Sequence, residues 1–244
     1  MPIDDQDLVQ LIRSSPLETV DDVIAVMRGL DSELANDDGL KWFNLLYLKV
    51  TEAIDTQPKT VQWENGQWLE LLDVNFAKLY FAALCDWQRN RDWVARAWLP
   101  LLQSRARHGI KRVQFALAGL NAHINHDLPV ALVQTGKASR IVLKRGTAEF
   151  RDFERVNSIL ATVQEDAKRY IATGLVGVID QSLADLDDNA ANWSVGKARE
   201  TAWSNGEILW RLNRTPLLRN EFLTNIDRLV SLASRGLLVS GGIT

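Results

Sequence analysis

The spacing of the apolar residues constrains the fold of this chain more than any other feature. Apolar side chains recur at intervals of three and four residues and rarely at two, which is the period of one face of a helix. The six prolines and most of the glycines fall between the periodic blocks. We therefore predict an all-α, single-domain helical bundle of about eight helices. The predicted helical segments are residues 16–34, 42–50, 68–87, 92–107, 111–127, 149–182, 195–210 and 216–234.

The length and the charge of the chain narrow the class of protein. Its 244 residues are enough for one large domain with a sizeable core, spanning residues 1–244. The 28 basic and 31 acidic residues give a formal net charge of -3, so no global field attracts nucleic acid or an anionic membrane. Cys85 is the single cysteine, which fits a reducing compartment, and no apolar stretch of signal or membrane length follows Met1. We expect a cytoplasmic protein with no nucleic-acid partner and no membrane span.

The segment Asn121–Pro129 is the part of the sequence that most suggests chemistry. It holds two of the three histidines, His123 and His126, beside Asp127. Because His123 and Asp127 are four residues apart, they project from one face of a helix and can hold one ion or each other. The residue before a proline disfavours the α conformation, so we predict that the helix ends or kinks at Leu128 and that its freed carbonyls face a cavity.

Polar residues also fall inside the apolar stripes of three other predicted helices. Asp73 lies in the middle of the stripe that includes Phe76 and Tyr80. Asn157 and Arg199 lie within the stripes of two later helices. A buried polar group without a partner costs about 1–3 kcal/mol and a buried charge costs more, so these side chains are expected to find partners. Together with the histidine segment, they predict a central polar cavity in the bundle.

Four blocks of the sequence form a recognisable set: Leu72–Phe81, Ala118–Pro129, Arg155–Leu160 and Ala198–Trp203. These blocks resemble the motif blocks of a family of uncharacterised bacterial proteins that are all-helical. The resemblance spans roughly residues 39–210, and its central block is fairly specific. No activity follows from this resemblance. It implies one shared site made of Asp73, His123, Asp127, Asn157 and Arg199.

A second, partial likeness is to the zinc-dependent phospholipase C and P1 nuclease group, whose motif has His, three residues, Asp and then a proline. His123, Asp127 and Pro129 are similar to that fragment, with the proline closer to the aspartate than usual. The trinuclear zinc site of that group draws on several histidines, whereas this chain has three in all. The likeness therefore implies at most a one- or two-metal site. Its ion would be Zn, Fe or Mn, with Asp73, His123 and Asp127 as ligands and His126 in the adjacent position.

The same residues admit a structural and a catalytic interpretation. In the structural one, Asp73 pairs with Arg199, His123 bonds to Asp127, and Asn157 bridges backbone groups. In the catalytic one, a cytoplasmic enzyme uses His123 as a general base that Asp127 orients, with Asp73 as a second acid, base or metal ligand.

In the catalytic interpretation, Arg199, Asn157 and Tyr80 bind the substrate. Basic residues such as Lys137 and Lys144 follow the histidine segment, so a small anionic or oxygen-rich molecule is the favoured substrate. Metal-assisted hydrolysis is one version of this chemistry. The competing class is a non-catalytic ligand-binding or interaction protein whose polar core serves stability. The sequence leaves the substrate, the reaction class and the oligomeric state open.

Overall fold

The computed structural model describes residues 5–56, 63–173 and 195–239. All regular secondary structure in these residues is helical, which confirms the all-α prediction. The longer helices are α1 (Asp5–Ser14), α2 (Val20–Glu33), α3 (Gly39–Asp55), α4 (Gly66–Arg89), α5 (Leu99–Ser104), α6 (Arg112–Ala122), α7 (Leu128–Ser139), α8 (Ala148–Thr173), α10 (Val195–Arg211) and α11 (Pro216–Leu237). The short helices are η1 (Arg91–Trp93), η2 (His123–Asp127) and η4 (Leu212–Arg214).

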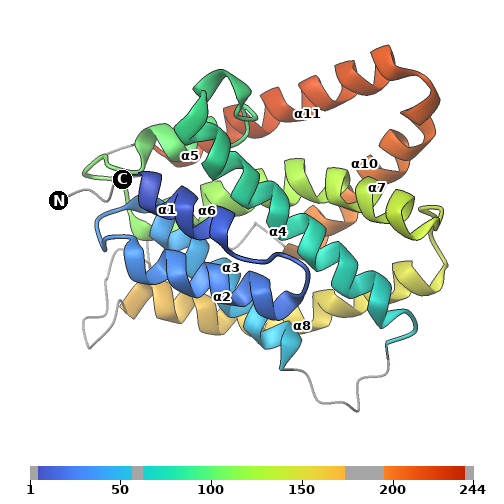
Figure 1. Cartoon of the computed structure of the whole chain (residues 1–244), viewed down its shortest axis with the longest axis horizontal. Helices are drawn as coiled ribbons and strands as arrows, with labels where there is room; N and C mark the ends of the chain where they lie inside the picture. Colours follow the sequence, from blue (N-terminus) through green and yellow to red (C-terminus); the bar gives the residue numbers. More distant parts are fainter. Residues whose placement is uncertain (1–4, 57–62, 174–194, 240–244) are drawn as a thin grey trace.

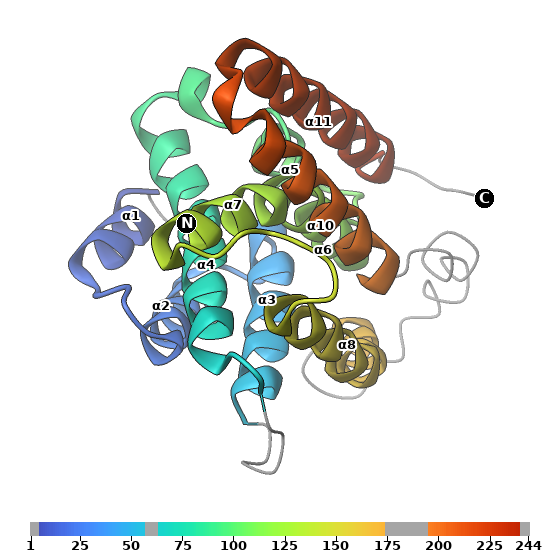
Figure 2. The same cartoon turned by 90° about the vertical axis from the view of Figure 1, so that its right-hand side faces the viewer.

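Helix α3 lies at the centre of the bundle and packs against α2, α6 and α8. Helix α4 crosses beside it and packs against α7, which in turn packs against α10 (Figure 1). Helix α11 lies along one edge of the molecule and packs against α6 with its inner face. Figure 2 shows α8 and α10 on the same side of α3, with α11 above α10. The space enclosed by α3, α4, α6, α8 and α10 holds the candidate site.

The centre of the core is aromatic. Phe43 of α3, Tyr80 of α4 and Trp98 are fully buried, with ring centroids 4.9 to 5.4 Å apart. Gly119 lets α6 approach α3 closely, because a Cβ atom at this position would lie 2.3 Å from the Phe43 ring. Replacing this glycine would push α6 away from α3 and disturb the helix that leads into the histidine segment.

The first predicted helix begins later than its sequence suggested. The predicted segment starts at residue 16, but α2 begins at Val20. Thr19 is the N-cap: its hydroxyl accepts the backbone N–H of Asp22, and the Asp22 carboxylate accepts the backbone N–H of Thr19. This reciprocal pair satisfies two of the unpaired donors at the helix start, so the capping box fixes the boundary.

Helices α1 and α7 were not predicted. The segment predicted over residues 92–107 is mostly irregular and contains the end of η1 and the short α5. The last part of the segment predicted over residues 149–182 lies outside the described residues. Of the two outcomes predicted at Leu128, an end of the helix is wrong, because the chain passes from α6 through η2 into α7 without leaving helical backbone angles.

None of the helices in the described parts of the chain combines the length and the apolar character needed to cross a lipid bilayer.

Candidate functional site

The histidine segment forms a π-helical turn, η2. The backbone N–H of Leu128 bonds to the carbonyl of His123, five residues earlier. A proline ring has no N–H and clashes with the carbonyl four residues before it in a regular helix, so the wider turn accommodates Pro129 at the start of α7. The turn keeps His123 and Asp127 on one side, where both side chains are buried.

Asp127 is a buried carboxylate with three nitrogen partners. Its Oδ2 atom lies 3.1 Å from Nδ1 of His123 and accepts the indole N–H of Trp98 at 3.0 Å. Its Oδ1 atom lies 2.7 Å from Nδ1 of His126. Burial raises the pKa of Asp127, but the two imidazoles lower it more, and the net pKa is below its usual value. The carboxylate is therefore ionised at neutral pH and holds both imidazoles in place.

His126 extends this network toward the surface. Its Nε2 atom lies 3.6 Å from the Asp227 carboxylate of α11, which also accepts the backbone N–H groups of Arg96 and Ala97. Burial lowers the pKa of His126, but Asp127 and Asp227 together raise it above the usual value. A chain of alternating carboxylates and imidazoles thus runs from the centre of the bundle to the edge where α11 lies.

The ring of His123 is fixed by aromatic neighbours. Phe76 stacks on it with ring centroids 3.5 Å apart, and the edge of Tyr47 approaches it at 4.6 Å. Burial lowers the pKa of His123 despite the neighbouring Asp127, so the ring is neutral at pH 7. Because Asp127 accepts at Nδ1, the proton lies on Nδ1 and the lone pair on Nε2. Nε2 is buried and has no hydrogen-bond partner among the described residues.

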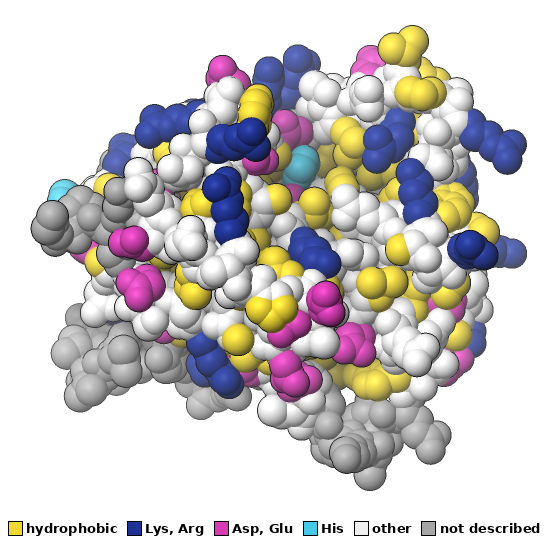
Figure 3. All heavy atoms as spheres, in the orientation of Figure 1, with side chains coloured by type: hydrophobic (Ala, Val, Ile, Leu, Met, Phe, Trp, Pro, Cys, Tyr) yellow, Lys and Arg dark blue, Asp and Glu magenta, His cyan; other side chains and the backbone are white. Residues whose placement is uncertain are grey.

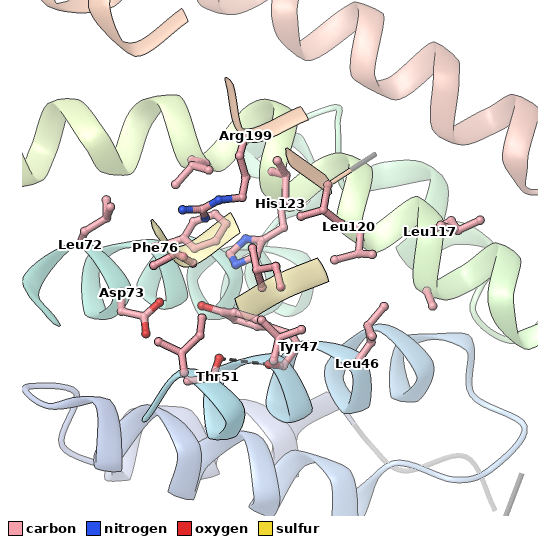
Figure 4. Close-up of a pocket in the computed structure, with 18 of the residues that line it drawn as sticks. Leu46, Tyr47, Thr51, Leu72, Asp73, Phe76, Leu117, Leu120, His123 and Arg199 are labelled. Carbon is pink, nitrogen blue, oxygen red and sulfur yellow. Dashed lines mark hydrogen bonds between the residues drawn. The ribbon is translucent and has the colours of Figure 1, made fainter. Parts of the chain in front are cut away.

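His123 lines a cavity of about 120 Å³ between α3, α4, α6, α8 and α10 (Figure 4). The sequence predicted a polar cavity, but most of the wall is apolar, with Leu, Val, Ile and Phe side chains from all five helices. The polar lining residues are few: Tyr47, Thr51, Asp73, His123 and Arg199. Figure 4 shows the side chains of Tyr47, Asp73, His123 and Arg199 directed toward the same space.

Asp73 and Arg199 face this cavity from opposite helices, α4 and α10. Burial raises the pKa of Asp73 to about 6, although the charge of Arg199 opposes the shift. Burial also lowers the pKa of Arg199 to about 10, so the guanidinium remains charged at neutral pH. The two groups form no ion pair within 4 Å in the described structure, so the direct pairing of Asp73 with Arg199 is not present.

Arg199 is held by other partners instead. Its Nε atom donates to the side-chain carbonyl of Asn157 at 2.7 Å, and Nη2 donates to the backbone carbonyl of Phe153 at 3.1 Å. The guanidinium lies 4.1 Å above the ring of Phe153. Asn157 therefore stands behind Arg199 and orients it, and Asn157 is absent from the cavity wall.

Tyr47 is a site residue that the sequence argument missed. Its hydroxyl is buried and makes no hydrogen bond of normal geometry with any described residue. Burial, and then the charges of Asp73 and Asp127, raise the pKa of Tyr47 well above its usual value, so the phenol keeps its proton. The four-residue spacing of Tyr47 and Thr51 was the available signal, because it places both side chains on one face of α3.

Tyr80 was expected to bind the substrate and lies elsewhere. It is fully buried, donates to the side-chain carbonyl of Asn44 at 3.3 Å, and does not line the cavity. Of the predicted site residues, Asp73, His123 and Arg199 face the cavity, whereas Asp127 lies behind His123.

The described residues contain no cluster of three or more His, Cys, Asp or Glu side chains that could hold a metal ion. Asp73, His123 and Asp127, which the partial zinc-enzyme likeness placed around one ion, do not form such a cluster. Both oxygens of Asp127 are already engaged by nitrogen donors, so Nε2 is the ring nitrogen of His123 that is left without a partner in the described residues.

Comparisons with known proteins place the chain in a family but give it no activity. No curated protein and no solved structure shows a significant match to the chain. A family model described as a family of unknown function, DUF5995, matches residues 20–240. This match covers most of the sequence and includes every residue of the candidate site, and the chain belongs to the DUF5995 family.

Proposed function

We propose that this protein is an enzyme that binds a small molecule in the cavity and acts on it by proton transfer at Nε2 of His123. The observation that carries the proposal is the state of that imidazole. One ring nitrogen is held by a buried carboxylate, and the other is buried, unpaired and directed at a cavity. A neutral imidazole with an oriented Nδ1–H and a free Nε2 is the arrangement of a general base.

The cavity wall indicates the chemistry of the ligand. A cavity of about 120 Å³ is comparable to engineered protein cavities of about 150 Å³ that hold benzene, so the ligand is small or enters only in part. The apolar wall favours an apolar body, and the few polar residues favour one oxygen-bearing group such as a carboxylate or an ester. We therefore replace the broad class of oxygen-rich ligands by a narrower one, an apolar molecule with one polar group.

The other polar residues have separate roles in this proposal. Tyr47 keeps its proton and donates a hydrogen bond to the ligand oxygen. Arg199 supplies a fixed positive charge, because Asn157 and Phe153 hold its guanidinium in place. Asp73, with a pKa of about 6, acts as a second acid or base near neutral pH.

Proton transfer by side chains is favoured over metal-assisted hydrolysis. Catalytic zinc sites commonly have three protein ligands. The cavity wall supplies one free imidazole nitrogen and the Asp73 carboxylate, and the described residues form no larger ligand cluster. Elemental analysis of protein purified without chelators, for Zn, Fe and Mn, checks this preference, since a stoichiometric metal would reverse it.

The second candidate function is ligand binding without catalysis. The apolar wall favours it, because that wall and one or two hydrogen-bonding groups are sufficient to bind a small molecule. In that case His123 and Arg199 would recognise the polar group of the ligand and transfer no proton.

The experiment compares wild type with His123→Gln, using His108→Gln as the control because His108 is exposed and outside the cavity. Butanoate serves as the binding probe and methyl butanoate as the hydrolysis probe, both followed by NMR. Turnover of methyl butanoate that falls at least about a hundredfold in His123→Gln supports the enzyme. Binding of butanoate without turnover supports the binding protein. Absence of both, with a loss of several kcal/mol of stability in His123→Gln, supports a structural network.

A further inference from the structure

Helix α11 has a second apolar face that nothing in the described structure covers. Its inner face, with Ile226 and Val230, is buried against the bundle. On the outer face, Leu218, Leu229 and Leu232 are 54%, 67% and 68% exposed. At 100° per residue these three leucines fall within an arc about 60° wide. Side chains this exposed and this closely grouped on one helix are typical of a contact surface.

Arginines follow one flank of this apolar row. Arg228 and Arg235 of α11 line a surface hollow with Arg96, which precedes α5, and the exposed Leu232 borders the same hollow. No acidic side chain lines the hollow in the described residues. None of the ion pairs found in the described parts of the chain involves these three arginines. Figure 3 shows basic and hydrophobic side chains, with a few acidic ones among them, along the upper edge of the molecule, where α11 lies.

One of the two acidic residues of α11 is turned away from this flank. Asp227 of α11 accepts the backbone N–H groups of Arg96 and Ala97 and lies beside Nε2 of His126. The carboxylate of Asp227 is therefore bound within the network of imidazoles and carboxylates that leads to His123. Glu221 stays exposed two turns before Arg228 on the same flank, so one carboxylate stands against the three arginines Arg96, Arg228 and Arg235. The outer face of α11 thus has a local positive charge, although the whole chain has a net charge of -3.

We propose that this face, the α11 ridge of Leu218, Leu229, Leu232, Arg228 and Arg235, docks the protein onto an anionic lipid surface. The leucines enter the boundary between headgroups and acyl chains, as the apolar face of an interfacial helix does. The arginines, together with Arg96, bind the lipid phosphates. The helix lies in the plane of the interface and does not cross the bilayer.

Charge favours a lipid surface over a second copy of the chain. A twofold contact through the ridge would bring the same positively charged face of two molecules together. An anionic bilayer supplies the opposite charge along the whole ridge and accepts the exposed leucines without needing a matching groove. Binding of this kind weakens as salt screens the charges.

The test is co-sedimentation of the full-length protein with vesicles of phosphatidylcholine alone or of phosphatidylcholine mixed with phosphatidylglycerol. We expect binding to increase at least about tenfold with the anionic lipid and to decrease with added salt. Leu229→Gln/Leu232→Gln removes the apolar contact and is expected to lower binding at least about tenfold. Arg228→Gln/Arg235→Gln is expected to lower binding about fivefold for each arginine.

Two control variants match these changes elsewhere on the surface. Val142→Gln alters an exposed apolar residue, and Lys137→Gln/Lys144→Gln removes two exposed basic residues. Both are expected to bind like wild type, and circular dichroism checks that every variant is folded. Equal binding to the two kinds of vesicle, no binding, or controls that fall as far as the ridge variants would overturn the proposal. A dimer in sedimentation velocity that the leucine variant abolishes would also overturn it, by assigning the face to a second copy.

Discussion

Phe76 lies flat against His123, with ring centroids 3.5 Å apart and ring planes 5° apart. This stacking, together with the Nδ1 contact to Asp127, leaves the imidazole one orientation. Nε2 then faces the cavity without a hydrogen-bond partner in the described structure (Figure 4). The direction of that nitrogen is therefore set by packing as much as by the carboxylate.

Phe76→Leu is predicted to loosen the imidazole. The substitution removes the stacked ring and should cost about 1–2 kcal/mol of stability, measured by urea unfolding. It should also change the NMR signals of His123, because the ring gains freedom to turn. Phe81→Leu is the matched control, because Phe81 is also buried on α4 but its ring packs on Tyr80 instead of His123. If both variants change the His123 signals equally, Phe76 has no particular role in orienting the ring.

His126 is predicted to make stability depend on pH. Asp127 and Asp227 raise its pKa despite burial, so the folded state holds a proton that the unfolded state releases more readily. The stabilisation is fully present below the unfolded pKa of about 6.5 and is lost as pH rises through the folded pKa. His126→Gln should therefore cost about 2 kcal/mol near pH 5.5 and much less near pH 9, measured by urea unfolding.

His108→Gln is the control for this pH series, because His108 is exposed and should leave stability unchanged at both pH values. A cost for His126→Gln that is the same at both pH values would show that the charged form of His126 is not bound by the two carboxylates.

Asp73→Asn is predicted to stabilise the protein at alkaline pH. Burial raises the pKa of Asp73 to about 6, so the folded state keeps a proton that the unfolded state loses near pH 3.8. The contribution of Asp73 to the free energy of unfolding therefore falls as the pH rises from 3.8 to about 6, and it stays low at higher pH. An asparagine at this position removes the cost of burying the ionised carboxylate. We place this cost at about 2 kcal/mol near pH 8, allowing for the partial exposure of Asp73.

The control for Asp73→Asn is Asp37→Asn, which removes an exposed carboxylate from the turn before α3. It should change stability little. If Asp73→Asn destabilises the protein near pH 8, the carboxylate has a partner that outweighs its burial.

Helical periodicity predicted most of the fold, and its failures have physical causes. The rule that proline ends a helix hid α7, because the π turn at His123–Asp127 accommodates Pro129 and lets the helical path continue. The start of α2 was misplaced by four residues because Thr19 is the residue that forms the reciprocal capping bonds with Asp22.

The phase of each helix placed Asp73, His123 and Arg199 on inward faces, and the structure places all three on the cavity wall. The helical phase of a residue shows which side of the helix it is on, but it does not show how far along the helix axis the cavity extends. Tyr80 shares the inward arc of Asp73 but lies two turns further along α4, beyond the cavity. Tyr47 was missed because α3 is buried almost all round, so that no polar face reveals which side chains line a cavity.

The central claim is that His123 is a neutral base held by Asp127, with its free nitrogen at the cavity. The most direct measurement is the ¹H–¹⁵N NMR spectrum of histidine-labelled protein at about pH 7, which is simple to assign because the chain has only three histidines. We predict that Nδ1 of His123 is protonated and Nε2 is not, and that this state persists when the pH falls to about 6. A proton on Nε2 at neutral pH would contradict the account.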